Sequence, residues 1–273
     1  MFWQFFLKNR LAIVGVTCIF VVFLVAFLAP VLAPYDPGAT SVSAKLASPS
    51  WQHWLGTDHL GRDVFSRMLY GARISLSVGF VAVGLSLVIG VFVGAISGYY
   101  GKWVDTVLMR FVDMMMCFPS FFLILTIIAL LGPNIIHVMI VIGITSWMGT
   151  ARLVRAEFLT LRERDFVRAA HALGARDRRI IFYHILPNAL APVFVVATLD
   201  VATAILVEAG LSFLGFGVQP PAPSWGNILT AGRDYIFDAW WLTLFPGLAI
   251  LITVLSFNLF GEGLRDALDP RLR

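Results

Sequence analysis

The chain has 273 residues, of which 59% are hydrophobic and 13% charged, and its formal net charge is +4. Soluble globular domains contain about 45–50% apolar and about 25% charged residues, so this composition excludes an ordinary soluble domain. A membrane-spanning helix needs about 20 mainly apolar residues. Six stretches come close to or exceed this length, so the sequence predicts an all-α membrane protein with six transmembrane helices: residues 11–32, 74–98, 107–131, 135–151, 189–213 and 242–261.

The orientation of these helices follows from the basic residues between them. Six spans place both termini on one side of the membrane, and cytoplasmic segments are enriched in lysine and arginine. With both termini inside, fifteen of the 20 lysines and arginines lie in cytoplasmic segments, and five lie outside: Lys45, Arg62, Arg67, Arg73 and Arg233. We therefore predict that both termini are cytoplasmic. The positive charge belongs to this cytoplasmic face and calls for no nucleic-acid partner.

The first span, residues 11–32, has a longer apolar core than a cleaved signal peptide, so we interpret it as an uncleaved anchor. An extracytoplasmic segment follows it to about residue 70. Thr57 or Asp58 can cap a short helix there. The spacing of Asp58, His59 and Asp63 matches no standard set of metal ligands, so we expect no metal site.

The second and third spans each carry a feature that affects packing. Gly90 and Gly94 in the second span are four residues apart, a spacing that lets membrane helices approach closely. We therefore expect this helix to pack tightly against a neighbour. Pro119 in the third span should kink that helix, because proline removes a backbone hydrogen bond.

The polar stretch between the fourth and fifth spans, residues 152–188, carries eight arginines and four acids. Four apolar residues recur on one face of a predicted amphipathic helix in this stretch: Phe166, Ala169, Ala170 and Leu173. The small alanines should leave an exposed shoulder that suits docking against another protein. We therefore predict that this stretch forms a cytoplasmic helical hairpin.

Three residues should delimit the two helices of this hairpin. Gly174 should end the first helix, since glycine readily adopts the left-handed conformation found at helix ends. Asp177 can cap the second helix. Pro187 should stop the second helix, because proline has no N–H group and clashes with the preceding turn.

Three acidic residues lie within the spans: Asp113 in the third, and Asp200 and Glu208 in the fifth. Ionisable groups inside a bilayer are costly, and they mark either a transport pathway or a buried pair. We expect Glu208, and then Asp200, to face the translocation route or a partner subunit, or else to pair with an arginine or a helix end. A competing hypothesis is an ion-coupled secondary transporter that uses all three acids as ion sites.

The segment between the fifth and sixth spans is rich in glycine, proline and tryptophan. Amphipathic indole rings are enriched where a membrane meets water. We therefore expect Trp225, Trp240 and Trp241 to lie at the outer membrane interface.

The hairpin resembles the cytoplasmic loop of ABC importer permeases, whose signature runs Glu-Ala-Ala, three residues, Gly, nine residues, Ile, one residue, Leu-Pro. Five residues match at the required spacing: Ala169, Ala170, Gly174, Leu186 and Pro187. Arg168 and His184 depart from the signature, because they stand where Glu and Ile are usual. The resemblance implies that the loop docks on an ATPase subunit through Phe166, Arg168, Ala169, Ala170, Leu173, Gly174, His184, Leu186 and Pro187.

Three further segments resemble the dipeptide/oligopeptide/nickel branch of these permeases, and its C-type permeases in particular: LGTDHLGRD at 55–63, SFLGFGVQPPAPSWG at 212–226 and GLRDALDPRL at 263–272. The resemblance implies a permease subunit that forms half of the translocation pathway for di- or oligopeptides in an ATP-driven importer. Nickel or a metal chelate is the alternative cargo. The implied location is the bacterial or archaeal cytoplasmic (inner) membrane, with the chain as a multi-pass protein.

The resemblance also implies partners: a second homologous permease subunit, cytoplasmic ABC ATPase subunits, an extracytoplasmic substrate-binding protein and the lipid bilayer. The chain has no GxxxxGK[ST] phosphate loop and no HExxH, GxSxG or CxxC motif. We therefore expect this chain to be no enzyme and to hold no cofactor, with ATP and magnesium bound by the partner subunits.

The predicted spans and the resemblance divide the chain into three parts. Residues 1–70 form the N-terminal anchor and extracytoplasmic segment, and residues 71–265 form the permease core. The core includes the hairpin stretch 152–188, and residues 266–273 form a cytoplasmic tail.

Overall fold

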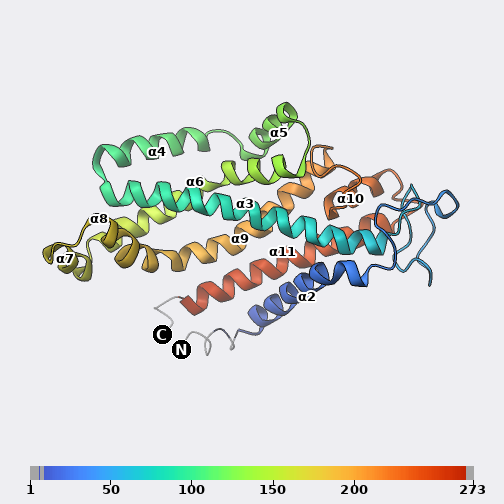
Figure 1. The fold of residues 1–273 in the computed structure, drawn as a ribbon, viewed down its shortest axis with the longest axis horizontal. Helices are drawn as coiled ribbons and strands as arrows, with labels where there is room; N and C mark the ends of the chain where they lie inside the picture. Colours follow the sequence, from blue (N-terminus) through green and yellow to red (C-terminus); the bar gives the residue numbers. More distant parts are fainter. Residues whose placement is uncertain (1–5, 7–8, 269–273) are drawn as a thin grey trace.

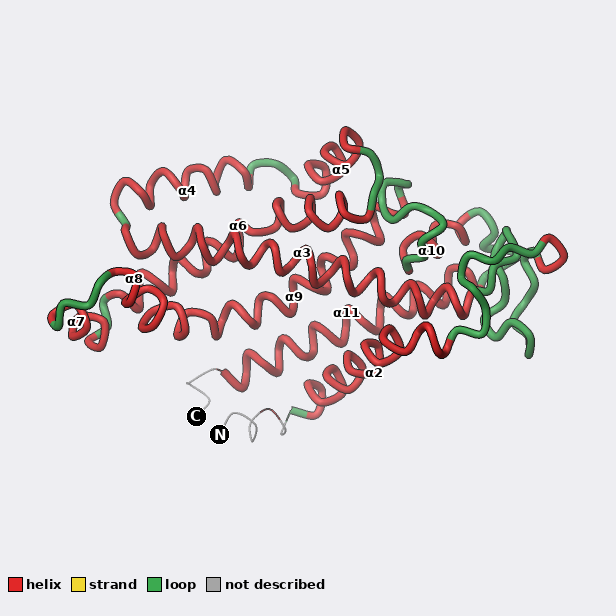
Figure 2. Tube along the Cα trace, viewed as in Figure 1, coloured by secondary structure: helices red, strands yellow, loops and turns green. Residues whose placement is uncertain are grey.

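The computed structural model describes residue 6 and residues 9–268. The regular elements in this part of the chain are helices, and no strand occurs there (Figures 1 and 2). The all-α prediction is therefore confirmed. Residues 269–273 of the predicted tail lie outside the described residues. In chain order the elements are α2 (Arg10–Leu32), η1 (Val42–Ala44), α3 (Val64–Tyr100), α4 (Lys102–Met116), α5 (Ser120–Leu131), α6 (Ile135–Arg162), α7 (Asp165–Ala172), α8 (Asp177–Arg179), η2 (Ile180–Ile185), α9 (Leu186–Phe213), α10 (Trp225–Arg233) and α11 (Trp241–Leu268).

Within the described residues, five helices are long and apolar enough to cross a membrane: α2, α3, α6, α11 and the continuous helix Asp177–Phe213. Helices α4 and α5 meet the same criteria only as a pair, with a bend of 80° between them, so the number of spans is six when this bent pair is counted as one. The third predicted span, 107–131, is wrong as a single helix, because α4 ends before Cys117 and α5 begins directly after Pro119. Proline disfavours the helical conformation in the residue before it, so the chain breaks here instead of kinking mildly.

The helices form an elongated bundle in which α3 packs along α6 on one side and contacts α2 and α9 on others (Figure 1). Helices α7 and α8 lie at one end of the bundle, and α10 lies with the segment 33–63 at the other. Asn9 Nδ2 donates to Asp266 Oδ2 at 3.3 Å, which joins the start of α2 to the end of α11. Both helix ends lie towards the α7 end of the bundle, and the placement of the two termini in the cytoplasm stays a prediction.

Helix α3 approaches α6 closely at glycines spaced four residues apart. A Cβ atom at Gly94 would lie 2.5 Å from the carbonyl oxygen of Ala151, and one at Gly98 would lie 2.6 Å from Phe158 Cβ. Such distances are too short for atoms that are not bonded, so only glycine permits this separation of the two helices. The predicted tight packing of the second span is confirmed, and α6 is the neighbour that Gly90 also meets.

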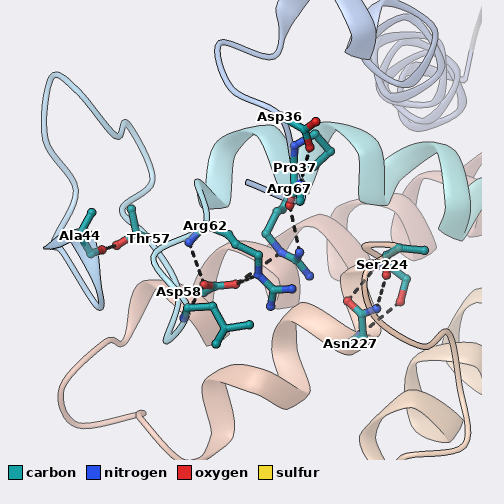
Figure 3. Close-up of polar contacts among 12 residues, drawn as sticks. Asp36, Pro37, Ala44, Thr57, Asp58, Arg62, Arg67, Ser224 and Asn227 are labelled. Atoms are coloured by element: carbon teal, nitrogen blue, oxygen red, sulfur yellow. Dashed lines mark hydrogen bonds and ion pairs between the residues drawn. The ribbon is translucent and has the colours of Figure 1, made fainter. Parts of the chain in front are cut away.

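Buried charges hold the segment before α3 at the end of the bundle opposite α7. Asp58 Oδ2 accepts a hydrogen bond of 2.7 Å from Arg62 Nε and lies 3.7 Å from Arg67 Nε (Figure 3). Asp63 caps α3, because its Oδ2 accepts from a backbone N–H in the first turn at 2.8 Å. The prediction that Thr57 or Asp58 caps a short helix is therefore wrong. The Asp58 carboxylate instead pairs with two arginines that are themselves buried.

Two of the three tryptophans predicted at the outer interface are buried. Trp225 Nε1 donates to the carbonyl oxygen of Met68 at 3.1 Å, and Trp241 Nε1 donates to that of Thr57 at 3.1 Å. Trp240 is exposed, as an interfacial residue would be. A buried indole N–H needs an acceptor, and a backbone carbonyl in the first turns of α3 and one in the segment before α3 provide it. The interface prediction is wrong for Trp225 and Trp241.

Candidate functional site

The first helix of the predicted hairpin is α7, and a Schellman turn ends it. Gly174 has a φ of +76°, and its N–H donates to the carbonyl oxygen of His171 at 2.9 Å. The N–H of Ala175 donates to the carbonyl oxygen of Ala170 at 3.1 Å. These two bonds satisfy carbonyl groups that the end of a helix leaves open. The predicted helix end at Gly174 is confirmed.

The second helix of the hairpin continues past Pro187 and becomes the fifth span. Elements α8, η2 and α9 form one helix, Asp177–Phe213. In η2 the turn widens to a π-helix, and the N–H of Leu186 donates to the carbonyl oxygen of Ile181, five residues earlier. The wider turn accommodates the proline ring, which would otherwise crowd the preceding turn of the helix. The prediction that Pro187 stops the helix is therefore wrong.

Asp177 occupies a different position from the predicted one. Arg176 holds the N-cap position, and Asp177 lies in the first turn, where a negative charge complements the helix dipole. Asp177 Oδ1 also accepts a hydrogen bond of 2.8 Å from the hydroxyl of Tyr99. The capping prediction is wrong, and Asp177 instead connects the hairpin to the end of α3.

A buried cluster fastens α7 to the spans. Val167 and Ala170 of α7 pack with Phe158 of α6 and with Ile180 and Ile185 of η2, and all five side chains are buried. Val167 was absent from the predicted face, although its spacing of three residues from Ala170 signals a shared helix face. Because protein interiors are close-packed, a displacement of α7 reaches α6 and the fifth span directly.

The outer face of α7 is apolar and open to solvent. Leu173 is 88% exposed, Phe166 is 45% exposed, and Ala169 lies exposed beside them. The predicted apolar face is therefore divided, since Ala170 faces inward and the other three residues face outward. Only one of the two alanines belongs to the exposed shoulder. We call Phe166, Ala169 and Leu173 the outer face of α7, and such an exposed apolar patch is typical of a protein-contact surface.

The remaining predicted docking residues do not all lie on α7. Arg168 Nη2 donates to Glu163 Oε2 at 2.9 Å, and this guanidinium holds the pKa of the Glu163 carboxyl below its ordinary value. His184 is half-buried on η2. Leu186 and Pro187 line two different grooves between the spans. Leu186 and Pro187 therefore shape the root of the hairpin, and α7 carries its outer face.

At the hairpin end of the bundle, polar contacts that the sequence did not predict connect α3, α4 and α6. Arg155 of α6 binds the carboxylate of Asp105 on α4 through two hydrogen bonds of 2.5 and 2.6 Å. Ser97 Oγ of α3 donates to Asp105 Oδ1 at 2.5 Å. Arg162 Nη1 donates to the carbonyl oxygen of Tyr99 at 2.8 Å. These partners are 8 to 63 positions apart, so no local pattern indicates them.

The three acids predicted as pathway residues lie in three separate surroundings. Asp113 forms an ion pair with Arg152 of α6, and both side chains are about half exposed. Glu208 is fully buried and accepts hydrogen bonds from Ser212 Oγ at 2.8 Å and from the hydroxyl of the Ser224 cap of α10 at 2.9 Å. This contact matches the alternative in which Glu208 pairs with a helix end. A pathway role for the acids stays a prediction.

Asp200 faces a different feature of the molecule, a cavity of about 40 Å³ between α3, α6 and α9. The cavity is lined by apolar groups and by the hydroxyls of Ser86, Ser146 and Thr203. A shared ion site of a secondary transporter would require these three acids to lie close together. The structure places them apart.

Two family comparisons cover most of the chain. Residues 90–273 match the family described as binding-protein-dependent transport system inner membrane component. Residues 1–49 match the N-terminal TM domain of oligopeptide transport permease C.

Curated relatives extend over nearly the whole chain. The dipeptide transport system permease protein DppC of Alkalihalophilus pseudofirmus is 49% identical, over 97% of this chain and 88% of its own length. The di/tripeptide transport system permease protein DppC of Pseudomonas aeruginosa is 44% identical, over 100% of this chain and 92% of its own. The DppC protein of Haemophilus influenzae is 42% identical, over 100% and 94% respectively.

The fold is also similar to that of a solved transporter. A chain of the MetNI methionine ABC transporter, in an inward-facing conformation, aligns with a TM-score of 0.56 and 21% identity over 73% of this chain and 95% of that chain. At this identity the likeness concerns the fold alone. Together with the helices that can span a membrane, these comparisons show that the chain is a multi-pass membrane protein and belongs to the binding-protein-dependent transport system inner membrane components, the permeases of ABC importers.

Proposed function

We propose that this chain is a permease subunit of an ATP-driven importer and forms half of a translocation pathway for di- or oligopeptides. The relatives that are named as dipeptide or di/tripeptide permeases, at 42% to 49% identity, support this cargo. A second, homologous permease supplies the other half of the pathway. Cytoplasmic ABC ATPase subunits bind ATP and magnesium, and an extracytoplasmic binding protein delivers the cargo. The assembly resides in the bacterial or archaeal cytoplasmic membrane.

The two apolar sides of α7 carry the proposal. Val167 and Ala170 anchor the helix to this chain, while Phe166 and Leu173 remain exposed on its outer face. A helix that is apolar on both sides, at the charged end of a membrane protein, needs a second protein to cover the outer face. We assign that face to an ATPase subunit, because this chain has no phosphate loop and the energy of ATP must enter from outside it.

The mechanism follows from how the hairpin is attached. Closure of an ATPase pair on ATP displaces α7, and the cluster around Phe158 passes the displacement to α6 and to the helix Asp177–Phe213. The bidentate pair of Arg155 and Asp105 carries α4 along with α6. Movement of these spans as rigid bodies changes which end of the pathway is open.

Replacement of Leu173 tests the assignment of the outer face. Leu173→Asp places a charge on the exposed apolar side chain at the C-cap of α7, so copurification of the ATPase subunits with the tagged chain should fall about tenfold, the effect of losing about 1.4 kcal/mol of binding free energy. Val42→Asp is the matched control, since Val42 is 83% exposed and lies in η1, away from α7 at the other end of the bundle. Unchanged ATPase association in Leu173→Asp, at normal membrane levels, would refute the assignment.

Transport by the reconstituted complex tests the cargo. Proteoliposomes that contain the permease pair, the ATPases and the binding protein should accumulate a labelled dipeptide only when ATP is present on the ATPase side. Accumulation of nickel or a nickel chelate in place of the dipeptide would replace the proposed cargo and retain the importer. Accumulation without any ATPase subunit would favour a secondary transporter.

A further inference from the structure

A groove of about 560 Å³ runs between the inner half of α3 and the start of the helix Asp177–Phe213. A hydrogen bond between Tyr99 and Asp177 joins these two elements near the α7 end of the bundle (Figure 1). The walls of the groove are almost entirely apolar, and Arg178 is the one charged residue that lines it. The α3 wall includes Val88, Phe92, Ile96 and Tyr100.

The groove has the length of one leaflet of a membrane. From Val88 to Tyr100 a helix rises about 18 Å, at about 1.5 Å per residue. Half of the hydrocarbon core of a bilayer measures about 15 Å. Val88 and Phe92 are 69% and 65% exposed, so the deeper part of the wall is open to whatever surrounds the protein. When α3 spans a bilayer with Tyr100 at the membrane surface, these two side chains lie at the depth of the hydrocarbon core.

The cytoplasmic end of the groove is cationic. Arg178 lies at this end, and a second hollow next to it is lined by Arg176, Arg178 and Arg179. No ion pair within the described part of the chain involves any of these three arginines. The acid among them, Asp177, accepts the hydroxyl hydrogen of Tyr99. That bond sets the place of Arg178 beside α3, because the two residues are adjacent on the helix.

We propose that this groove binds an anionic phospholipid of the inner leaflet, with an acyl chain along α3 and the phosphate on Arg178. The groove and such a lipid match along their length. The apolar wall meets the acyl chain towards the bilayer centre, and the cationic end meets the anionic phosphate at the cytoplasmic surface. Arginine suits this role because its guanidinium binds phosphate oxygens in a bidentate manner. Basic pockets between membrane helices on the cytoplasmic side are general sites for anionic headgroups.

Retained lipid tests the site in the assembled transporter. The complex of this chain with its partner subunits is reconstituted into nanodiscs of equal amounts of phosphatidylglycerol and phosphatidylcholine, extracted in mild detergent and analysed by native mass spectrometry. The wild type should retain phosphatidylglycerol in preference to phosphatidylcholine. Since one arginine near a membrane surface contributes about 1 kcal/mol, Arg178→Gln should lower the retained ratio about fivefold.

Two further variants separate the groove from general surface charge. Val88→Trp leaves every charge in place but fills the apolar wall, and it should also lower phosphatidylglycerol retention. Arg265→Gln removes an exposed arginine from the last turn of α11 and should leave the ratio unchanged. Normal amounts of each variant in the membrane show that insertion is intact.

Several results would overturn the proposal. Equal losses in Arg178→Gln and Arg265→Gln would mean nonspecific attraction, and an unaltered ratio in Val88→Trp would mean that no acyl chain lies in the groove. If Arg178→Gln loses the ATPase subunits while the lipid ratio stays at the wild-type value, Arg178 is a protein contact and the lipid site is refuted.

Discussion

The hydroxyl of Tyr99 donates a hydrogen bond of 2.8 Å to Asp177 Oδ1, although the two residues are 78 positions apart. Tyr99 lies in the last turn of α3, and Asp177 lies in the first turn of the second hairpin helix. The carbonyl oxygen of Tyr99 accepts from Arg162 Nη1 of α6 at 2.8 Å. Three helices therefore meet at one buried tyrosine, and polar bonds reinforce the apolar packing that holds the hairpin.

Tyr99→Phe should destabilise the hairpin end of the bundle. The substitution removes the hydroxyl and keeps the ring, and a hydrogen bond to a charged group contributes about 1.5–3 kcal/mol when buried. Because Asp177 is exposed, we expect a smaller loss in the free energy of unfolding, of about 1 kcal/mol. Thermal unfolding of the purified protein measures it. Tyr183→Phe is the control, because the Tyr183 side chain on η2 is exposed, and equal shifts in both variants would contradict a specific role for the bond.

Adjacent alanines of α7 should respond differently to the same change. Ala169→Glu alters the outer face, so the hairpin should remain folded and ATPase copurification should fall. Ala170→Glu buries an unpaired carboxylate against Phe158 and Ile180, so the hairpin itself should become sensitive to limited proteolysis. Cleavage within residues 164–176 distinguishes the two. Equal protease sensitivity would show that both alanines face the same way.

Gly94→Ala should force α3 and α6 apart. The new methyl group would lie 2.5 Å from the carbonyl oxygen of Ala151, and overpacking of this kind costs about 1–3 kcal/mol. Gly149→Ala is the matched control on α6, because a Cβ atom there meets nothing within 4 Å. Alanine also favours helix over glycine by about 0.5–1 kcal/mol, so the control should be neutral or slightly stabilised. Shifts of the thermal midpoint in the same direction in both variants, relative to the wild type, would contradict the close approach of α3 and α6.

The pair of Arg155 and Asp105 should show coupling in a double-mutant cycle. Both groups are partly buried and joined by two hydrogen bonds, so Arg155→Gln or Asp105→Asn alone should cost about 1–3 kcal/mol. The double variant should cost less than the sum, since neither partner is then left unpaired. Chemical unfolding in detergent measures the four stabilities. Additive costs would show that the pair contributes no interaction energy.

Several features of this protein could be predicted from short stretches of sequence. The length of an apolar stretch decides whether it can cross a membrane, and the left-handed preference of glycine ends α7 at Gly174 wherever the helix lies. The spacing of Gly90 and Gly94 likewise predicts a closely packed neighbouring helix, but it does not identify which helix that is. These properties depend on residues within one or two turns, so the sequence contains all that is needed to infer them.

Other features were decided by neighbours that lie far along the chain. Ala169 and Ala170 are identical in volume and polarity, yet only Ala170 is buried, because Phe158 and Ile180 pack against that side of α7. Pro187 passes through a helix because the π-turn before it widens the backbone, and Trp225 is buried because a carbonyl at the start of α3 accepts its N–H. Periodicity marks the apolar faces of a helix, but only the assembled bundle determines which of them its own chain covers and which a partner must.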